Sequence, residues 1–283
     1  MSLAGKLNVV SFFLIHIACL AAFWTGVDAQ ALILCAASFG LRMFGITGGY
    51  HRYFSHKTYR VNRVVQFLMA WLGCSSAQKG PLWWAAHHRA HHLNADERTD
   101  IHSPVREGFW WSHAGWVLDT KYDETNEKLI PDLMKYPELV WMNKYFLVPP
   151  FLWGLLCIAI AGWKGAVWGF LISTVLLWHA TFLINSAAHL FGRRRFETTD
   201  ASRNSFILAL LTLGEGWHNN HHYYPSATNQ GFYWWELDVT YYGLKLMQFF
   251  GLAKDIRTPP ARVLELGIKN DENAYRNQAI SHV

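Results

Sequence analysis

Four apolar blocks constrain the fold of this chain more than any other feature of its sequence. Each carries at most one charged residue and has about the length that a helix needs to cross the hydrocarbon core of a bilayer. A cleaved signal peptide would explain the first block alone, but three further blocks favour a protein that crosses the membrane several times. We therefore predict an all-α integral membrane protein with four transmembrane helices in two hairpins. The predicted spans are residues 8–27, 29–49, 145–163 and 166–184.

The distribution of Lys and Arg orients these spans. Of the 25 basic residues, 12 lie between the second and third spans and 10 follow the fourth, whereas the turns within the hairpins contain only Lys164. Cytoplasmic segments carry the excess of basic residues, so we place both termini and both long segments in the cytoplasm. Two shorter apolar stretches, 64–77 and 204–214, are predicted to be interfacial or buried helices. The chain is then one domain over 1–283, with a cytoplasmic cap formed by 50–144 and 185–283.

The net charge of +5 narrows the possible partners. It fits attraction to anionic lipid headgroups or to an acidic redox protein. The basic residues are dispersed and no recognition motif accompanies them, so we expect no nucleic-acid partner.

Histidines gather in three short motifs of the predicted cap, HRYFSH, HRAHH and HNNHH, which hold eight of the 15 histidines. Positions i, i+3 and i+4 share one face of an α-helix, so each HxxHH triplet is predicted to aim three imidazoles at one point. His87 points about 100° away from its neighbour by the same geometry, and we exclude it. The candidate ligands are His51, His56, His88, His91, His92, His218, His221 and His222.

The HRYFSH motif needs a different explanation, because a spacing of five residues does not bring two side chains to the same face of a regular helix. Gly48 and Gly49 precede the motif. We therefore predict that the second span ends or distorts there, which lets both imidazoles turn inward.

The number of imidazoles indicates the kind of metal site. Eight exceed what one zinc ion takes, and an all-nitrogen set of this size favours two transition metals, with iron as the candidate if the chemistry involves oxygen. The apolar surroundings would admit an alkyl chain, whose C–H bonds offer no acidic proton. Oxygen activated at a metal centre can cleave such bonds.

From about Gly45 to about Asp255 the chain resembles the membrane fatty-acyl desaturase family that includes the stearoyl-CoA desaturases. The motifs are GYHRYFSHKTYR, HHRAHH, DIHSPVREGFWWSHAGW, INSAAHL and GEGWHNNHHYYP. The resemblance implies an enzyme that forms a cis double bond, expected at Δ9, with two iron ions (Fe2+/Fe3+) and O2 as co-substrate. It also implies that His189 completes the di-iron centre, and that Asn185 reaches it directly or through water.

The resemblance implies a separate electron donor of the ferredoxin, rubredoxin or cytochrome type, with its reductase, because no fused haem domain and no flavin or nicotinamide motif is visible in the sequence. The stretch QKGPLWWAAHHRAHH is most similar to bacterial and cyanobacterial members, so we expect a bacterial inner membrane.

The carrier of the acyl chain is where the sequence departs from the stearoyl-CoA members. They place an Arg-Asp pair before the second histidine motif, where this chain has Ala86-His87, and an Arg-Lys pair after HAGW, where it has Thr120-Lys121. We expect a long-chain acyl-CoA, the commonest carrier in the family, with lipid-bound acyl chains as the alternative.

Further residues are expected to orient the ligands or to touch the substrate, and no catalytic residue is expected beyond the metal ligands. A carboxylate such as Glu215 can accept an imidazole N–H. For Asp100 and Arg106 a solvated loop position is the alternative, and for His113 a buried core position. The full set is Asp100, His102, Arg106, His113, Glu215, Trp84, Trp116 and Lys121.

Two other functions use the same residues differently. A di-iron hydroxylase or alkane oxygenase shares the metal chemistry, but NSAAHL and GEGWHNNHH favour desaturation. A non-enzymatic metal-binding or transport protein would carry ionisable residues along its spans, and these spans offer little beyond Arg42 and His179. We therefore predict a desaturase.

Overall fold

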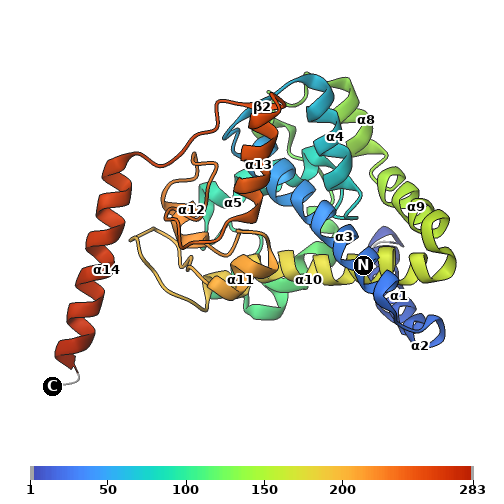
Figure 1. The fold of residues 1–283 in the computed structure, drawn as a ribbon, viewed down its shortest axis with the longest axis horizontal. Helices are drawn as coiled ribbons and strands as arrows, with labels where there is room; N and C mark the ends of the chain where they lie inside the picture. Colours follow the sequence, from blue (N-terminus) through green and yellow to red (C-terminus); the bar gives the residue numbers. More distant parts are fainter. Residues whose placement is uncertain (1–2, 282–283) are drawn as a thin grey trace.

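The computed structural model describes residues 3–281, and within that range the fold is mostly helical (Figure 1). The α-helices are α1 Leu3–Ala18, α2 Ala22–Thr25, α3 Ala29–Phe44, α4 Arg63–Cys74, α5 Pro81–Asn94, α6 Pro104–Glu107, α7 Trp116–Leu118, α8 Pro137–Lys144, α9 Val148–Lys164, α10 Ser173–Asn185, α11 Phe206–Leu211, α12 His218–Tyr223, α13 Val239–Phe249 and α14 Ala261–Ser281.

Shorter 3-10 and π-helices connect these elements. The 3-10 helices are η1 Cys19–Ala21, η4 Thr120–Tyr122, η5 Glu127–Leu129 and η7 Ala187–His189, and the π-helices are η2 Gly45–Ser55, η3 Trp111–Gly115 and η6 Gly165–Ile172. Two short strands, β1 Arg60–Val61 and β2 Ala253–Lys254, pair antiparallel, with Arg60 opposite Lys254.

Two helical runs are long and apolar enough to cross a membrane, Ala29–Ser55 and Val148–His189. The first predicted span forms α1, η1 and α2, whose apolar part, Val9–Thr25, is shorter than a span requires. The arrangement of four spans in two hairpins therefore stays a prediction. The stretches expected at 64–77 and 204–214 form helices, α4 and α11.

The run Val148–His189 turns back on itself. Its backbone leaves helical geometry at Ala161 and at Gly162, where φ is 56°, a left-handed value that favours glycine. The two arms then pack together, since a Cβ added at Gly169 would lie 3.0 Å from Sγ of Cys157. The turn thus precedes the link at residues 164–165 that the sequence predicted, because glycine, and not the charge of Lys164, supplies the conformation.

The second predicted span does not end at its glycine pair. The helix continues from α3 into the π-helix η2 as far as Ser55. The helix is therefore distorted at the glycine pair, as predicted, but it does not end there. Gly49 lies against α4, where its Cβ would be 3.1 Å from the carbonyl oxygen of Met69. The main core forms here, from buried residues of η2, α4, α5 and α10 that include Ile46, Tyr50, Phe54, Met69, Leu82 and Leu177.

The contact between η2 and α4 depends on Gly45, and we expect Gly45→Ala to destabilise the protein. A Cβ there would lie 2.5 Å from the backbone nitrogen of Gly73 and 2.6 Å from the carbonyl carbon of Leu72. Because both atoms belong to the backbone, the helices must move apart, which costs about 1–3 kcal/mol. Thermal unfolding in detergent measures the loss. Gly40→Ala in α3, where a Cβ would meet nothing within 4 Å, is the control, and equal shifts in Tm would contradict the prediction.

The C-terminal helix α14 extends away from the rest of the molecule (Figure 1). Its first half packs against the rest of the chain, where Val263 contacts Phe196 and Phe232. Asp271 of α14 pairs with Arg195 at 3.0 Å.

Candidate metal centre

Nine histidines from four segments of the chain converge. His51 and His56 come from η2 and its C-terminal end, three from α5, one from η7 and three from α12. They form two clusters, in each of which one ring nitrogen per residue lies within 4.8 Å of the others. The five-histidine cluster is His51, His56, His88, His92 and His221, and the four-histidine cluster is His91, His189, His218 and His222.

Each HxxHH triplet is divided between the two clusters, which corrects the prediction that a triplet aims at one point. His88 and His92 belong to the five-histidine cluster, and His91 to the other. The three side chains of a triplet together cover about 100° of the helix circumference. That arc is wide enough for one helix to face two centres. On α12 the division is the opposite, with only His221 in the five-histidine cluster.

The π-helix explains how a spacing of five residues brings His51 and His56 together. The N–H of His56 donates to the carbonyl oxygen of His51 at 3.1 Å, which is the i to i+5 hydrogen bond of a π-helix. Their ring centroids are 4.8 Å apart. Residues five apart therefore share a face here, although they do not in an α-helix.

Three aspartates fix the orientation of histidines in the four-histidine cluster. Nδ1–H donates to Asp100 from His91 at 3.0 Å, to Asp96 from His189 at 2.9 Å and to Asp200 from His222 at 2.9 Å. A neutral imidazole that donates through Nδ1 keeps its lone pair on Nε2. Each of these histidines thus has an Nε2 lone pair that could bind a metal.

The protonation states agree with this arrangement. Burial alone would raise the pKa of the Asp96 carboxyl, but hydrogen bonds from His189, Ser103 and the backbone of Ala201 bring that pKa to about 2. Burial, reinforced by the neighbouring imidazoles, lowers the pKa of His88 well below its ordinary value. The Asp96 carboxylate is therefore ionised and the His88 imidazole neutral, and a neutral imidazole is the form that binds metal.

Glu215 orients His51 in the five-histidine cluster. Its carboxylate contacts Nδ1 of His51, accepts a hydrogen bond of 2.8 Å from Gln230, and pairs with Arg52 at 2.9 Å. Arg52 also pairs with Asp238 at 2.9 Å and is 1% exposed. His51 is therefore held by Glu215, which is itself held by a buried network of Arg52 and Asp238.

The donor set fits two metal ions. Imidazole nitrogens approach each other closely, with Nε2 of His56 2.7 Å from Nε2 of His88 and Nε2 of His189 3.0 Å from Nε2 of His218. Nε2 of His222 is buried and has no hydrogen-bond partner among residues 3–281. Neutral nitrogens gathered in this way leave lone pairs that a cation would satisfy, and an all-imidazole set suits iron among other transition metals.

Loss of an orienting aspartate is expected to weaken metal binding. Asp100→Asn should lower the affinity for the metal about 10–100-fold, because the amide is a weaker acceptor for Nδ1–H of His91. Competition with a chelator measures the affinity. Asp119→Asn, which changes an aspartate that caps η4 through the N–H of Lys121, is the control, and equal affinities in the two variants would contradict the role of Asp100.

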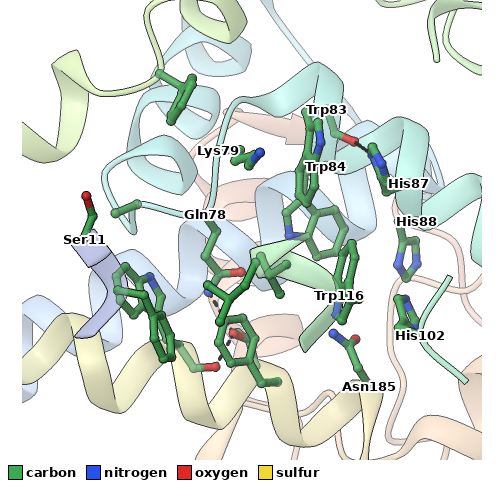
Figure 2. Close-up of a pocket in the computed structure, with 18 of the residues that line it drawn as sticks. Ser11, Gln78, Lys79, Trp83, Trp84, His87, His88, His102, Trp116 and Asn185 are labelled. Atoms are coloured by element: carbon green, nitrogen blue, oxygen red, sulfur yellow. Dashed lines mark hydrogen bonds between the residues drawn. The ribbon is translucent and has the colours of Figure 1, made fainter. Parts of the chain in front are cut away.

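An apolar cavity of about 390 Å³ leads to the histidines. Figure 2 shows it from Ser11 of α1 to His88, His102 and Asn185. A smaller space of about 50 Å³ continues between the two clusters and shares four lining residues with the first, namely Trp84, His88, Thr181 and Asn185. A hydrocarbon chain in the larger cavity would therefore lie beside His88 of the five-histidine cluster, and the smaller space that adjoins it is lined by histidines of both clusters.

Several further predicted residues line this cavity. Trp84 stacks on His88 with ring centroids 4.9 Å apart, and Trp116 lies 4.9 Å from His102. The ring of His102 lies 4.4 Å from that of His91. Asn185 lines both cavities at the end of α10.

Other predicted residues lie elsewhere. Arg106 donates to the backbone oxygen of Asp96 at 3.0 Å, and Lys121 is exposed, with its ammonium over the ring of Tyr122. Nε2 of His113 lies 2.9 Å from Nδ1 of His179, and Nε2 of His179 lies 2.9 Å from Nε2 of His16. These three histidines lie outside both clusters.

His87, excluded from the ligands, bonds through Nδ1 to the carbonyl oxygen of Trp83 at 2.8 Å and lines the cavity. Sequence reasoning missed three residues that support the ligands, Asp96, Asp200 and Arg52. Asp96 follows the second histidine motif by four residues, a signal that could have been used. For Asp200 nothing in the local pattern points to a histidine 22 residues later.

The comparisons with known proteins agree with this site. A model of the fatty acid desaturase family matches residues 29–246. The chain is 36% identical to an sn-2 palmitoyl-lipid 9-desaturase of Nostoc sp. over 90% of both chains. It is 36% identical to an sn-1 stearoyl-lipid 9-desaturase of Anabaena variabilis, covering 88% of this chain and 93% of the relative. It is 35% identical to an acyl-CoA 5-desaturase of Anemone leveillei, covering 87% and 77%. The chain therefore belongs to the fatty acid desaturase family, and it is an oxidoreductase of lipid metabolism.

Proposed function

We propose that this chain is an oxygen-dependent fatty-acyl desaturase that forms a cis double bond, at Δ9, at a di-iron centre. The observation that carries the proposal is the apolar cavity that passes Trp84 and Thr181 and reaches His88 and Asn185, where it adjoins the smaller space that histidines of both clusters line. A saturated chain held there has its C–H bonds next to the metal ligands, in a fixed position. Two of the relatives named above are 9-desaturases, which supports Δ9.

In this proposal the five-histidine cluster holds one iron ion, and the four-histidine cluster holds the other together with Asn185, directly or through water. Bound iron supplies the O2 activation that unactivated C–H bonds require. Glu215 and the three aspartates hold the Nδ1 protons of their histidines, so that the Nε2 lone pairs stay directed at the metals. Trp84 and Trp116 form walls that keep the chain in place.

The reaction needs two electrons from an external donor. Two adjacent methylene groups of the acyl chain each lose one hydrogen atom, which together carry two electrons and two protons. A ferredoxin, rubredoxin or cytochrome, with its reductase, supplies two more electrons, and the solvent supplies two more protons. One O2 is thereby reduced to two molecules of water.

The proposed topology has four spans, with the termini and the active site in the cytoplasm of a bacterium and the spans in its inner membrane. Both helical runs that are long enough to cross a membrane lead directly into ligands. Ala29–Ser55 contains His51, and Val148–His189 ends at His189. The membrane helices would in this way place two ligands at the boundary between bilayer and cap.

Expression in a bacterial host with a ferredoxin and its reductase tests the proposal. Mass spectrometry of the host lipids should find new monounsaturated chains and locate the double bond at Δ9. The same host with the His91→Ala variant controls for endogenous desaturation. Hydroxylated chains without unsaturated ones would contradict the proposal and indicate a di-iron hydroxylase instead.

A further inference from the structure

A basic cavity of about 300 Å³ lies apart from the two cavities that lead to the histidines, and it shares no lining residue with either of them. Its lining comes from η2, α4, β1 and the segments that lie just before α8 and just after β2. The elements α4, α8 and β2 lie together at one edge of the molecule (Figure 1). Small-molecule sites begin at about this volume, so the cavity can take a compact group.

One buried amide in the wall of this cavity lacks a partner. Gln66 of α4 lines the cavity and is 2% exposed, and its Nε2–H donates to the hydroxyl of Tyr53 at 3.3 Å. Its Oε1 is buried and has no hydrogen-bond partner among residues 3–281. A buried acceptor that stays unpaired destabilises a protein. Gln66 is therefore suited to accept a hydrogen bond from a hydroxyl group of a bound molecule.

The cavity carries an excess of positive charge. The charged side chains that line it are Lys57, Arg60, Arg257 and Asp132. Asp132 is shared between two cations, because it pairs with Lys57 at 2.9 Å and with Arg89 at 2.7 Å. Arg60 pairs at 3.4 Å with Asp255 at the exposed rim. With these partners included, four cations stand against two carboxylates.

The neighbouring charges do not reverse this sign. Arg63 and Glu138 pair with each other at 2.7 Å. Lys254, which lies opposite Arg60 in the strand pair, and Lys135, which precedes the lining residue Tyr136, are exposed cations. The cavity therefore attracts an anion.

Arg257 is the cation in this cavity that is free to bind the anion. Its guanidinium donates to the carbonyl oxygen of Lys57, which orients it. It makes no ion pair within the part of the chain that the structure describes. A guanidinium offers several N–H donors in a planar fork that matches the oxygens of a phosphate group. A phosphate is therefore the anion that the cavity fits best.

Exposed apolar side chains flank the cavity on two sides. Val64 and Leu68 are exposed on α4, and Phe249 and Phe250 are exposed at the end of α13. The strand pair lies between these helices along the chain, since β1 precedes α4 and β2 follows α13. Exposed apolar surface beside basic residues is typical of a surface that meets an anionic membrane. The flanks therefore favour a phosphate that belongs to a lipid.

We propose that this basic cavity binds a phosphate ester that carries a free hydroxyl group, with Arg257 on the phosphate and Oε1 of Gln66 accepting the hydroxyl. The headgroup of phosphatidylglycerol and free sn-glycerol 3-phosphate both have this chemistry. The bound molecule is not the acyl substrate, because the cavity does not join those beside the histidines. Its binding can thus be measured without iron and without turnover.

Native mass spectrometry of the protein in detergent tests the phosphate contact. We expect phosphatidylglycerol to bind at least about tenfold more tightly than phosphatidylcholine, whose headgroup is not anionic and has no free hydroxyl. Arg257→Met should weaken the binding of phosphatidylglycerol about tenfold, because hydrogen bonds between charged groups are lost. Lys245→Met, which removes an exposed cation of α13 that bonds to Gln248, should bind as the unchanged protein does. Equal losses in the two variants would indicate a general attraction to basic surface and would overturn the proposal.

Gln66→Leu tests the hydroxyl contact, because leucine offers no acceptor. It should weaken phosphatidylglycerol about threefold or more and leave phosphatidylmethanol, whose headgroup has no hydroxyl, unchanged. Equal effects on the two lipids would overturn the role of Gln66.

A third probe, sn-glycerol 3-phosphate, distinguishes the source of the phosphate. If it binds more tightly than phosphatidylglycerol and Arg257→Met weakens it, the site is supported with a soluble ligand. Equal binding of phosphatidylglycerol and phosphatidylcholine, with no binding of the soluble probe, would overturn the proposal. So would an Arg257→Met variant that keeps its phosphatidylglycerol but, when loaded with iron, is reduced more slowly by ferredoxin, since the cations would then belong to a docking surface for the electron donor.

Discussion

His88→Ala and His91→Ala are expected to lose different iron ions, although the two residues are one helical turn apart on α5. Nε2 of His88 lies 2.7 Å from Nε2 of His56 in the five-histidine cluster. His91 belongs to the four-histidine cluster and is held by Asp100. Each variant should retain about one of the two irons, and its activity should fall more than about 100-fold. The loss of a ligand should weaken metal binding more than the loss of the ligand's hydrogen-bond partner, which costs about 10–100-fold.

Elemental analysis and Mössbauer spectroscopy measure the iron content and distinguish the two sites. The remaining iron should give a different quadrupole doublet in each variant. His87→Ala is the matched control for iron content, since His87 belongs to neither cluster and bonds to the backbone of Trp83. Identical spectra from the two ligand variants would contradict the division of the triplet. Equal iron loss from His87→Ala would show that the assignment of helix faces is wrong.

The sequence predicted which histidines lie together better than how they are grouped. The histidine motifs and the family resemblance together selected nine histidines, and all nine lie in the two clusters. His87, which helical periodicity separates from them, lies in neither cluster. It could not assign His91 and His88 to different clusters, because that depends on how α5 and α12 pack around two centres, which is tertiary information.

The places where the backbone leaves α-helical geometry were harder to predict than the histidines, because the same residues precede different backbone conformations. Gly48 and Gly49 indicated a distortion, but a π-helix and the end of a helix have the same glycine signal. The i to i+5 hydrogen bond at His56 distinguishes them only in three dimensions. Likewise, the sequence predicts the turn at residues 164–165, between two apolar blocks, whereas the chain turns at Gly162, which adopts a positive φ.

The supporting carboxylates show a second limit of sequence reasoning. Asp96 reaches His189 and Asp200 reaches His222, and the first of these contacts joins residues 93 positions apart. No period or spacing in one sequence connects such pairs. Only Glu215 and Asp100, each within a motif that also carries histidines, were predicted.

Arg52→Met is expected to cause the largest loss of stability of any single change considered. Arg52 is 1% exposed and pairs with both Glu215 and Asp238, which are 6% and 1% exposed. Without the guanidinium, the buried carboxylates of Glu215 and Asp238 both lose the cation that pairs with them. Removing one partner of a buried ion pair costs about 3–5 kcal/mol, and here one residue serves two pairs.

Thermal unfolding in detergent, followed by intrinsic tryptophan fluorescence, measures this loss. Arg63→Met is the matched control, because Arg63 pairs with Glu138 at 2.7 Å on the exposed surface, and such a pair contributes about 0.2–1 kcal/mol. Arg52→Lys is the second variant, for use if Arg52→Met does not accumulate as folded protein. It keeps the charge and loses the forked geometry of the guanidinium, so we expect its Tm to lie between those of Arg52→Met and the unchanged protein. Equal Tm values for Arg52→Lys and the unchanged protein would contradict the role of the guanidinium. The iron content of Arg52→Lys then separates stability from site support, because Glu215 joins Arg52 to His51 and a displaced Glu215 should weaken the five-histidine cluster first.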